Sequence, residues 1–301
     1  MAVGDTITAD RYNTLQTRID DILGVGSSTS GYGQSLSSQQ VSITDTVQAQ
    51  DMTNLYNDMV NARTHQTGSE PTSIAVIAPG NVIGENTSDE PDGSLKGYTD
   101  FENLMTIIED NKLNIDFATQ SSTGVSQTST KSNWNGVLDH VVTFTWPSSD
   151  ARRHFFNTRG EIRTSAAISG GSGSKTEDWR TMLSNMGTIK LNYLETVSTG
   201  SGTGSSIGFY DLTSSYQTVF NKAGSGVYAE NDYIVQARIA TATTLDIRIY
   251  FRDDDTGDQT GLGPPVDENV DGTLTSTVGF LRASGPYVSI PEPSSSNTNL
   301  L

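Results

Sequence analysis

The stretch that decides the fold class is Thr244-Leu245-Asp246-Ile247-Arg248-Ile249-Tyr250-Phe251-Arg252. Apolar side chains occupy every second position of this stretch, and polar, charged or phenolic side chains fill the positions between them. Because successive side chains of a strand point to opposite faces, the pattern predicts a β-strand with one buried face. The opposite face is expected to meet solvent or a partner.

The rest of the C-terminal third has a similar pattern. Further short strands are predicted at residues 207–212, 217–220, 233–239, 273–282 and 287–290. Short strands separated by turn residues are typical of an antiparallel sandwich, which we expect over residues 207–301. The last eleven residues are rich in Ser, Pro and Asn, so a flexible tail is expected there.

A mixed segment is predicted upstream, at residues 133–206. It is expected to contain a strand at 140–146, a hairpin at 154–163 that turns at 157–160, and a helix at 175–186. Within that helix, one face carries apolar side chains at helical spacing, namely those of Trp179, Met182, Leu183 and Met186. Together with the N-terminal helices described next, these elements predict an α+β protein that is mainly β.

The N-terminal part contains an internal repeat. Asp5-Thr6-Ile7-Thr8-Ala9 recurs 40 residues later as Asp45-Thr46-Val47-Gln48-Ala49. Each copy precedes apolar residues at helical spacing, which are Tyr12, Leu15 and Ile19 in the first copy and Met52, Leu55 and Met59 in the second. The spacing predicts helices at 9–23 and 49–64 within a duplicated module at 1–70.

Two interpretations of this module stay open. Helices of this length are marginal alone, so they must pack on each other and on something else. In one interpretation they form a plain helical hairpin inside a domain. In the other, which we favour, the module docks on a neighbour, and the six apolar residues are the candidate docking contacts.

Residues 71–132 are expected to be an irregular linker region with one helix. A short strand is predicted at 73–77. Asp100 is the expected cap of the helix, which carries Phe101, Leu104, Met105 and Ile108 on one face. The polar stretch 119–132 is predicted to be a loop.

Composition excludes several classes of function. The chain has 301 residues with a net charge of −17 and no Cys, and it contains 36 Ser and 39 Thr. The charge argues against nucleic acid as a partner, because phosphate binding depends on Lys and Arg. No apolar run approaches the length of a membrane span. Residues 1–5 lack the basic and apolar regions of a secretory signal, so none is expected.

Catalytic motifs are absent from the sequence. The three His residues, His65, His140 and His154, do not have metal-ligand spacing. No G-x-S-x-G elbow is present, and no pair of carboxylates stands out for glycoside hydrolysis. The Gly-rich stretch before Lys175 lacks the Gly that a phosphate-binding loop places directly before Lys. We therefore expect a protein that is not an enzyme.

Two acidic turns are candidates for a cation site. Asp267, Asn269 and Asp271 match the first half of a calcium-binding loop, although the closing acid is replaced by Val278. The run 253–258 contributes further carboxylates, so the two turns could share a Ca²⁺ ion. The alternative is that both are solvated hairpin turns, whose Asp and Gly follow from turn geometry. No other cofactor is expected.

A basic cluster surrounds the predicted hairpin. It consists of Arg152, Arg153, Arg159 and Arg163. In so acidic a chain these side chains are expected to meet carboxylates, and we assign them to contacts between subunits.

Several segments together resemble structural virion proteins of tailed phages that infect marine bacteria, cyanobacteria above all. They are the 40-residue repeat, residues 153–163, the helix around Trp179 with the Asn185-Met186-Gly187-Thr188-Ile189 that ends it, and residues 228–233 and 267–278. The resemblance implies a particle component that is assembled in the host bacterial cytoplasm and located in the virion. It implies no catalytic residues.

The expected function is therefore assembly in the tail, neck or fibre apparatus of a phage. The expected partners are other virion proteins and copies of the chain itself in a ring or trimer. Two alternatives remain, a receptor-binding protein that recognises host-surface glycan through exposed Tyr210, Tyr228 and Tyr287, and a capsid decoration protein.

Overall fold

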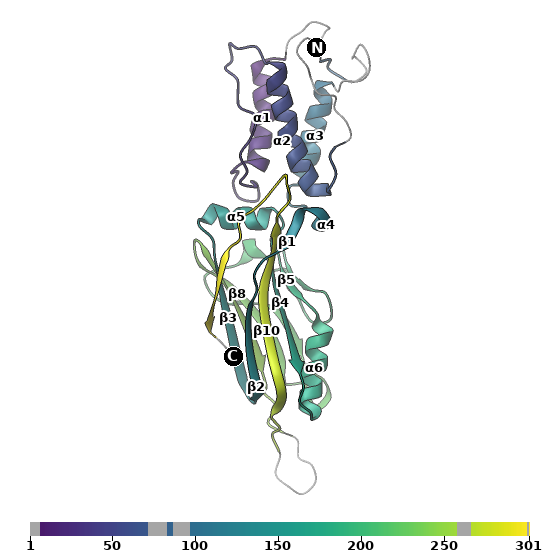
Figure 1. The fold of residues 1–301 in the computed structure, drawn as a ribbon, viewed down its shortest axis with the longest axis vertical. Coiled ribbons are helices and arrows are strands. Elements are labelled where there is room, and N and C mark those ends of the chain that lie inside the picture. Colours follow the sequence, from purple (N-terminus) through teal and green to yellow (C-terminus); the bar gives the residue numbers. More distant parts are fainter. Residues whose placement is uncertain (1–6, 72–82, 87–96, 258–265, 300) are drawn as a thin grey trace. The chain divides into compact units, whose positions relative to one another are not determined.

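The computed structural model describes residues 7–71, 83–86, 97–257, 266–299 and 301 (Figure 1). Its helices are α1 (Ala9–Leu23), α2 (Ala49–Thr67), α3 (Tyr98–Asp110), α4 (Phe117–Gln120), α5 (Ser149–Asn157) and α6 (Ser174–Met186). Its strands are β1 (Ser121–Thr123), β2 (Gln127–Trp134), β3 (Val137–Thr145), β4 (Glu161–Ser169), β5 (Ile189–Leu191), β6 (Thr196–Ser198), β7 (Gln217–Ala223), β8 (Asp232–Thr241), β9 (Thr244–Arg252), β10 (Val270–Ala283) and β11 (Ser294–Asn299). The predicted fold class, α+β and mainly β, is confirmed.

The chain forms two compact units. The helical unit comprises Met1–Ser122, Arg153–Arg159 and Arg282–Pro291, and the sandwich unit comprises Thr123–Arg152, Gly160–Leu281 and Glu292–Leu301. This division does not follow the four expected segments, because residues 133–206 and 207–301 both supply strands to both sheets. No helix in the described ranges combines the length and apolar character that a membrane span requires.

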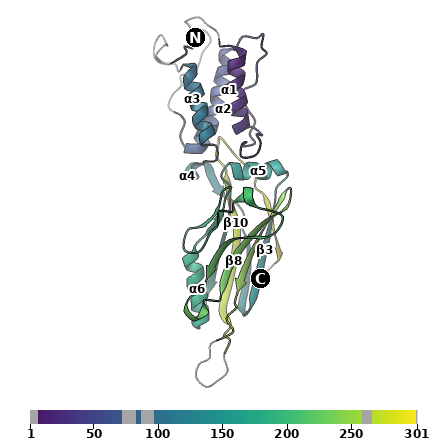
Figure 2. The ribbon, with the colours of Figure 1, turned by 180° about the vertical axis from the view of Figure 1, so that it is seen from behind.

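The helical unit is built on α1, α2 and α3, which lie side by side in both views (Figures 1 and 2). Thr8 caps α1 by accepting a hydrogen bond from the amide of Arg11, and Gly68 ends α2 in the left-handed conformation. The expected helices at 9–23 and 49–64 are thus present. The hydroxyl of Tyr98 on α3 donates to the carbonyl of Arg11 at 2.6 Å, which ties the third helix to the first.

The start of α3 differs from its prediction. The helix begins at Tyr98 after Gly97, so Asp100 lies inside the first turn and is not the cap residue. Its carboxylate accepts a hydrogen bond from the Gly97 amide at 2.9 Å, which satisfies one of the donors that a helix start leaves free. The strand expected at 73–77 lies outside the described residues.

The sandwich unit contains two antiparallel sheets. The six-stranded sheet has the order β1-β10-β4-β5-β6, and β2 also pairs with β10; the five-stranded sheet has the order β11-β3-β9-β8-β7. In Figure 1 β10 lies in the nearer layer and β8 in the farther one, and the turned view of Figure 2 reverses them. Helix α6 packs on β4 at the side of the six-stranded sheet.

The core of the sandwich unit is rich in aromatic side chains. On β9, the side chains of Leu245, Ile247, Ile249 and Phe251 are buried, as the alternating pattern predicts. Edge-to-face ring contacts join Phe251 to Tyr233 at 5.2 Å and Phe144 of one sheet to Phe280 of the other at 6.0 Å. Such ring pairs contribute about 0.5–1.5 kcal/mol each beyond the burial of their surface.

The predicted hairpin at 154–163 is wrong. Residues up to Asn157 form helix α5, and a strand begins only at Glu161, after Arg159 has turned the chain with a φ of +65°. The physical reason lies upstream, where the hydroxyl of Ser148 accepts a hydrogen bond from the amide of Ala151 at 3.0 Å. This cap starts a helix before the supposed hairpin begins.

Four further predictions of local structure are wrong, among them the strand at 287–290, where Ser289 forms only an isolated bridge with Ser284. The supposed loop at 119–132 contains β1 and β2, and the supposed flexible tail contains β11, which pairs with β3. These strands consist mostly of polar residues whose partners lie far away in the sequence, so they lack the apolar alternation of a half-buried strand. The predicted strand at 207–212 is instead a 3₁₀ turn, Phe209–Asp211.

Candidate functional site

The six candidate docking residues of the repeat lie in the interior of the helical unit. Tyr12, Leu15, Ile19, Met52, Leu55 and Met59 are all at most 1% exposed. They pack within the core that α1 and α2 share with α3, which also buries Phe101 and Met105. The additional packing surface that these short helices need is therefore supplied within the chain. Any docking by this unit must use other residues.

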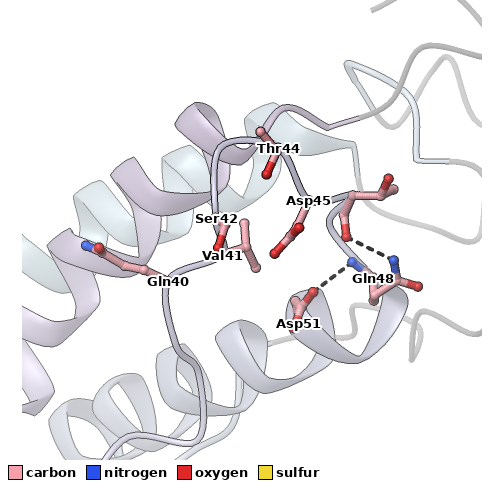
Figure 3. Close-up of a pocket in the computed structure, with 8 residues that line it drawn as sticks. Gln40, Val41, Ser42, Thr44, Asp45, Gln48 and Asp51 are labelled. Atoms are coloured by element: carbon pink, nitrogen blue, oxygen red, sulfur yellow. Dashed lines mark hydrogen bonds between the residues drawn. The ribbon is translucent and has the colours of Figure 1, made fainter.

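The loop that carries the second copy of the repeat forms a shallow polar recess (Figure 3). It is lined by Gln40, Val41, Ser42, Thr44, Asp45, Thr46, Gln48 and Asp51. The Gln48 amide donates to the Asp51 carboxylate at 2.8 Å, and the Gln48 side chain donates to the Thr46 carbonyl at 2.9 Å. These bonds begin helix α2, so the recess is explained by helix capping.

Arg152 and Arg153 are adjacent on α5 but bond to different parts of the chain. Arg152 donates to the carbonyls of Thr241 and Thr244 in the sandwich unit, at 2.7 and 3.0 Å. Arg153 donates to the carbonyls of Ser30, Val25 and Gly26 in the helical unit. Both arginines therefore use these donors on backbone oxygens of their own chain.

The other two predicted arginines lie just after α5. Arg163 pairs with Glu161, two residues away on the same strand, at 2.8 Å. Arg159 adopts the left-handed conformation between α5 and β4. The expectation that all four arginines join subunits stays a prediction.

One end of α5 holds a carbonyl-rich loop at residues 24–33. The side-chain amide of Asn157 donates to the carbonyls of Ser30, Gly31 and Ser28 at 2.7, 3.2 and 3.3 Å. His154 Nε2 lies 2.8 Å from the carbonyl of Val25. The sequence pattern predicts a hairpin at these residues, so it gives no sign of this contact.

The acidic turns meet a cation that belongs to the protein itself. Lys175, at the start of α6, is completely buried, and its Nζ lies 2.7 Å from Asp267, 3.1 Å from Asp253 and 3.2 Å from Asp255. We name these four residues the lysine cluster. The hydrogen bond from Lys175 lowers the pKa of Asp267, whereas burial raises the pKa of Asp253.

The assignment of Asp267, Asn269 and Asp271 to a calcium site stays a prediction; of the three, Asp267 contacts Lys175. Asn269 and Asp271 are exposed, and the Asp271 amide donates to the hydroxyl of Thr176 on α6 at 2.9 Å. In the part of the chain that the structure describes, no three His, Asp or Glu residues are placed to hold a metal ion. Asp258, the last acid of the upstream run, lies outside that part.

A buried polar bridge links the two sheets of the sandwich. His140 on β3 lies 2.9 Å from the hydroxyl of Ser276 on β10 through Nδ1, and 2.9 Å from the amide oxygen of Asn297 on β11 through Nε2. Both His140 and Ser276 are fully buried, and burial lowers the pKa of His140. The bridge therefore joins the two sheets through polar side chains in the interior of the sandwich unit.

The outward face of the five-stranded sheet carries a network of Arg, Asp and Tyr side chains. Arg248 stacks on the ring of Tyr250 at 4.0 Å and pairs with Asp139 at 2.6 Å. Arg238 lies over the ring of Tyr216 at 4.3 Å and pairs with Asp246 at 2.8 Å. The sequence predicted a face open to solvent or a partner here, but not that its charges would be paired.

Comparison with known proteins gives no relative. No family model, curated protein or solved structure matches the chain. Its residues and their geometry therefore provide the basis for assigning a function.

Proposed function

We propose that this chain is a non-enzymatic structural protein of a phage virion, most consistent with the tail, neck or fibre apparatus, that acts by assembly with its own copies and with other virion proteins. The observation that carries the proposal is a set of exposed apolar side chains at the β6 end of the six-stranded sheet. The resemblance of residues 153–163 and of the Trp179 helix to phage virion proteins supports the same conclusion.

We name Leu194, Val197 and Tyr210 the β6 patch. Their exposed fractions are 56%, 37% and 37%. Hydrogen bonds hold the two segments that carry them together: the Phe209 amide donates to the Asn192 carbonyl at 2.9 Å, and the Thr196 hydroxyl donates to the Ile207 carbonyl at 2.9 Å. Exposed aliphatic and aromatic side chains on two segments joined by hydrogen bonds favour a protein–protein contact.

The test is the oligomeric state of the full chain, measured by analytical ultracentrifugation. We expect the wild-type chain to form a closed oligomer, and the double variant Leu194→Ser, Tyr210→Ser to sediment as a monomer. Val137→Ser is the matched control, because Val137 is similarly exposed in the same unit but lies on β3. If the wild-type chain sediments as a monomer at every concentration up to the one reached in a phage-producing cell, the result would argue against self-assembly.

Position on the particle needs a separate measurement. Antibodies against the chain, detected on intact particles by electron microscopy, should label the tail, neck or fibres. Labelling of tailless heads alone would replace this proposal with capsid decoration. If the antibodies label neither the tail apparatus nor the heads, the chain is not a component of the virion.

A second candidate function is recognition of host-surface glycan. The Tyr216, Arg238, Arg248 and Tyr250 network favours it, because flat aromatic rings and paired hydrogen-bonding groups on a sheet face suit sugar rings. Of the three tyrosines expected for this role, Tyr287 donates to Glu70 at 3.0 Å, and Tyr228 lies in a 3₁₀ turn. Binding to host-cell glycans that Tyr250→Ala abolishes, without a change in the oligomeric state, would favour this candidate.

A further inference from the structure

The lysine cluster places a buried amine against a buried carboxyl group. Lys175 and Asp253 both have side chains with no exposed surface, and Lys175 Nζ lies 3.1 Å from one carboxylate oxygen of Asp253 and 3.2 Å from the other. The amine therefore contacts both oxygens of the carboxyl group with which it would react. An amine held in this way gains a large kinetic advantage over a free amine in solution.

We propose that Lys175 and Asp253 join in an intramolecular amide crosslink. The Nζ–Cγ bond forms and one Cγ–O bond of Asp253 breaks. The ammonium and the carboxylate together yield one amide and one water molecule, so no oxidant or co-reactant is required. The product fixes the start of α6 to the chain that leaves β9.

The two other carboxylates supply the proton transfers. Asp267 Oδ1, 2.7 Å from Nζ, accepts a proton from the ammonium and so frees the lone pair that attacks. Asp255, 3.2 Å from Nζ and nearly buried, takes the second proton that the nitrogen loses and passes it to the departing hydroxyl, which leaves as water. Burial raises the pKa of Asp253, so its carboxyl group takes up the first proton from Asp267 and reacts as the neutral acid.

The side chains of Lys175 and Asp253 have no exposed surface, whereas that of Asp267 is 40% exposed. Trp179 follows Lys175 by one helical turn, and its ring meets those of Trp134 at 5.1 Å and Phe251 at 6.2 Å. Exclusion of water favours a condensation and slows its reversal. A chain without Cys cannot form a disulfide, and an amide provides a covalent connection that does not depend on redox conditions.

The experiment is the intact mass of the full, denatured chain, followed by tryptic peptide sequencing. We expect a mass lower than that of the sequence by one water, no cleavage after Lys175, and a branched peptide that contains Lys175 and Asp253. A folded chain with the full sequence mass would overturn the proposal. A branch at Asp255 or Asp267 would overturn the assignment of Asp253.

Loss of water at another place must be distinguished. Asp271-Gly272 can form a cyclic imide of the same mass, but this gives a linear peptide and persists in Lys175→Arg. A linear dehydrated peptide in the wild type would therefore count against the crosslink. Asp253→Ala should regain the full mass, whereas Asp254→Asn, at an exposed neighbour that pairs with Arg252, should keep the wild-type mass deficit. If both cluster variants fail to fold, the wild-type peptide map still decides.

Discussion

At the scale of single residues, Gly33 sets how closely α5 can approach the 24–33 loop. Its φ is +68°, and a Cβ there would lie 2.3 Å from Nδ1 of His154. Gly136 has a φ of +81°, and a Cβ added to it would meet no other atom within 4 Å. A substitution at either glycine therefore meets similar backbone strain, but only one of them also meets a neighbouring ring.

We expect Gly33→Ala to reduce the free energy of unfolding by about 1–3 kcal/mol more than Gly136→Ala does. The reason is the additional displacement of His154 and of its contact with the loop. Urea denaturation of the two variants and the wild type measures the difference. Equal losses would show that the loop accommodates a methyl group.

His65 is a titratable group in the interior of the helical unit. Both of its ring nitrogens are buried without a hydrogen-bond partner among the described residues, and the ring meets Tyr32 edge-on at 5.0 Å. Burial lowers its pKa to about 3, from an ordinary value of 6.5. The folded chain therefore keeps His65 neutral at a pH where the unfolded chain protonates it.

The sign of the pH dependence follows. Above pH 6.5, His65 is neutral in both the folded and the unfolded chain. As the pH falls from 6.5 toward 3, the unfolded chain binds a proton that the folded chain does not, and the free energy of unfolding falls by up to about 1.4 kcal/mol for each pH unit. Hydrogen exchange of the α2 amides, measured between pH 7 and 4, should show this loss of stability. His65→Leu should flatten that dependence, and an unchanged slope in the variant would exclude His65 as its source.

At the scale of elements, β11 is held differently from the strands beside it. It buries no apolar side chain, and its main buried contact is the bond between Asn297 and His140. Strands without apolar burial open at a small fraction of the global free energy. We expect the β11 amides to exchange with solvent much faster than those of β9, in a native-state exchange experiment.

Removal of residues 294–301 tests what this strand covers. The truncation should leave the sandwich folded but expose the edge of β3, and free strand edges pair with other chains. We therefore expect association that increases with concentration in ultracentrifugation. Removal of Leu301 alone is the control, and a truncated chain that behaves like this control would show that β11 does not protect the edge.

The elements also show which features the sequence could predict. β9 and the repeat helices were predictable, because Leu245–Phe251 alternate and Tyr12, Leu15 and Ile19 follow a helical period. The strands β2 and β11 were not, because their Ser and Thr residues become strand residues only through distant partners. The sequence predicts only part of the lysine cluster. The acidic turns indicate a cation, but only the tertiary structure shows that Lys175 reaches them.

At the scale of the whole molecule, the net charge of −17 opposes association of identical copies. Ions screen such repulsion over about 10 Å at 0.1 M salt, so the long-range part weakens as salt increases. We therefore expect the proposed oligomer to dissociate less at 0.5 M than at 0.05 M NaCl, in sedimentation equilibrium. Stronger dissociation at high salt would indicate instead that ion pairs hold the copies together.

The division of the two units along the chain has a consequence for synthesis. The N-terminal residues alone do not make up the helical unit, since Arg153–Arg159 and Arg282–Pro291 also belong to it. A nascent chain on the ribosome therefore cannot complete this unit until residue 291 has been translated. Chains that terminate before residue 282 would carry an incomplete helical unit.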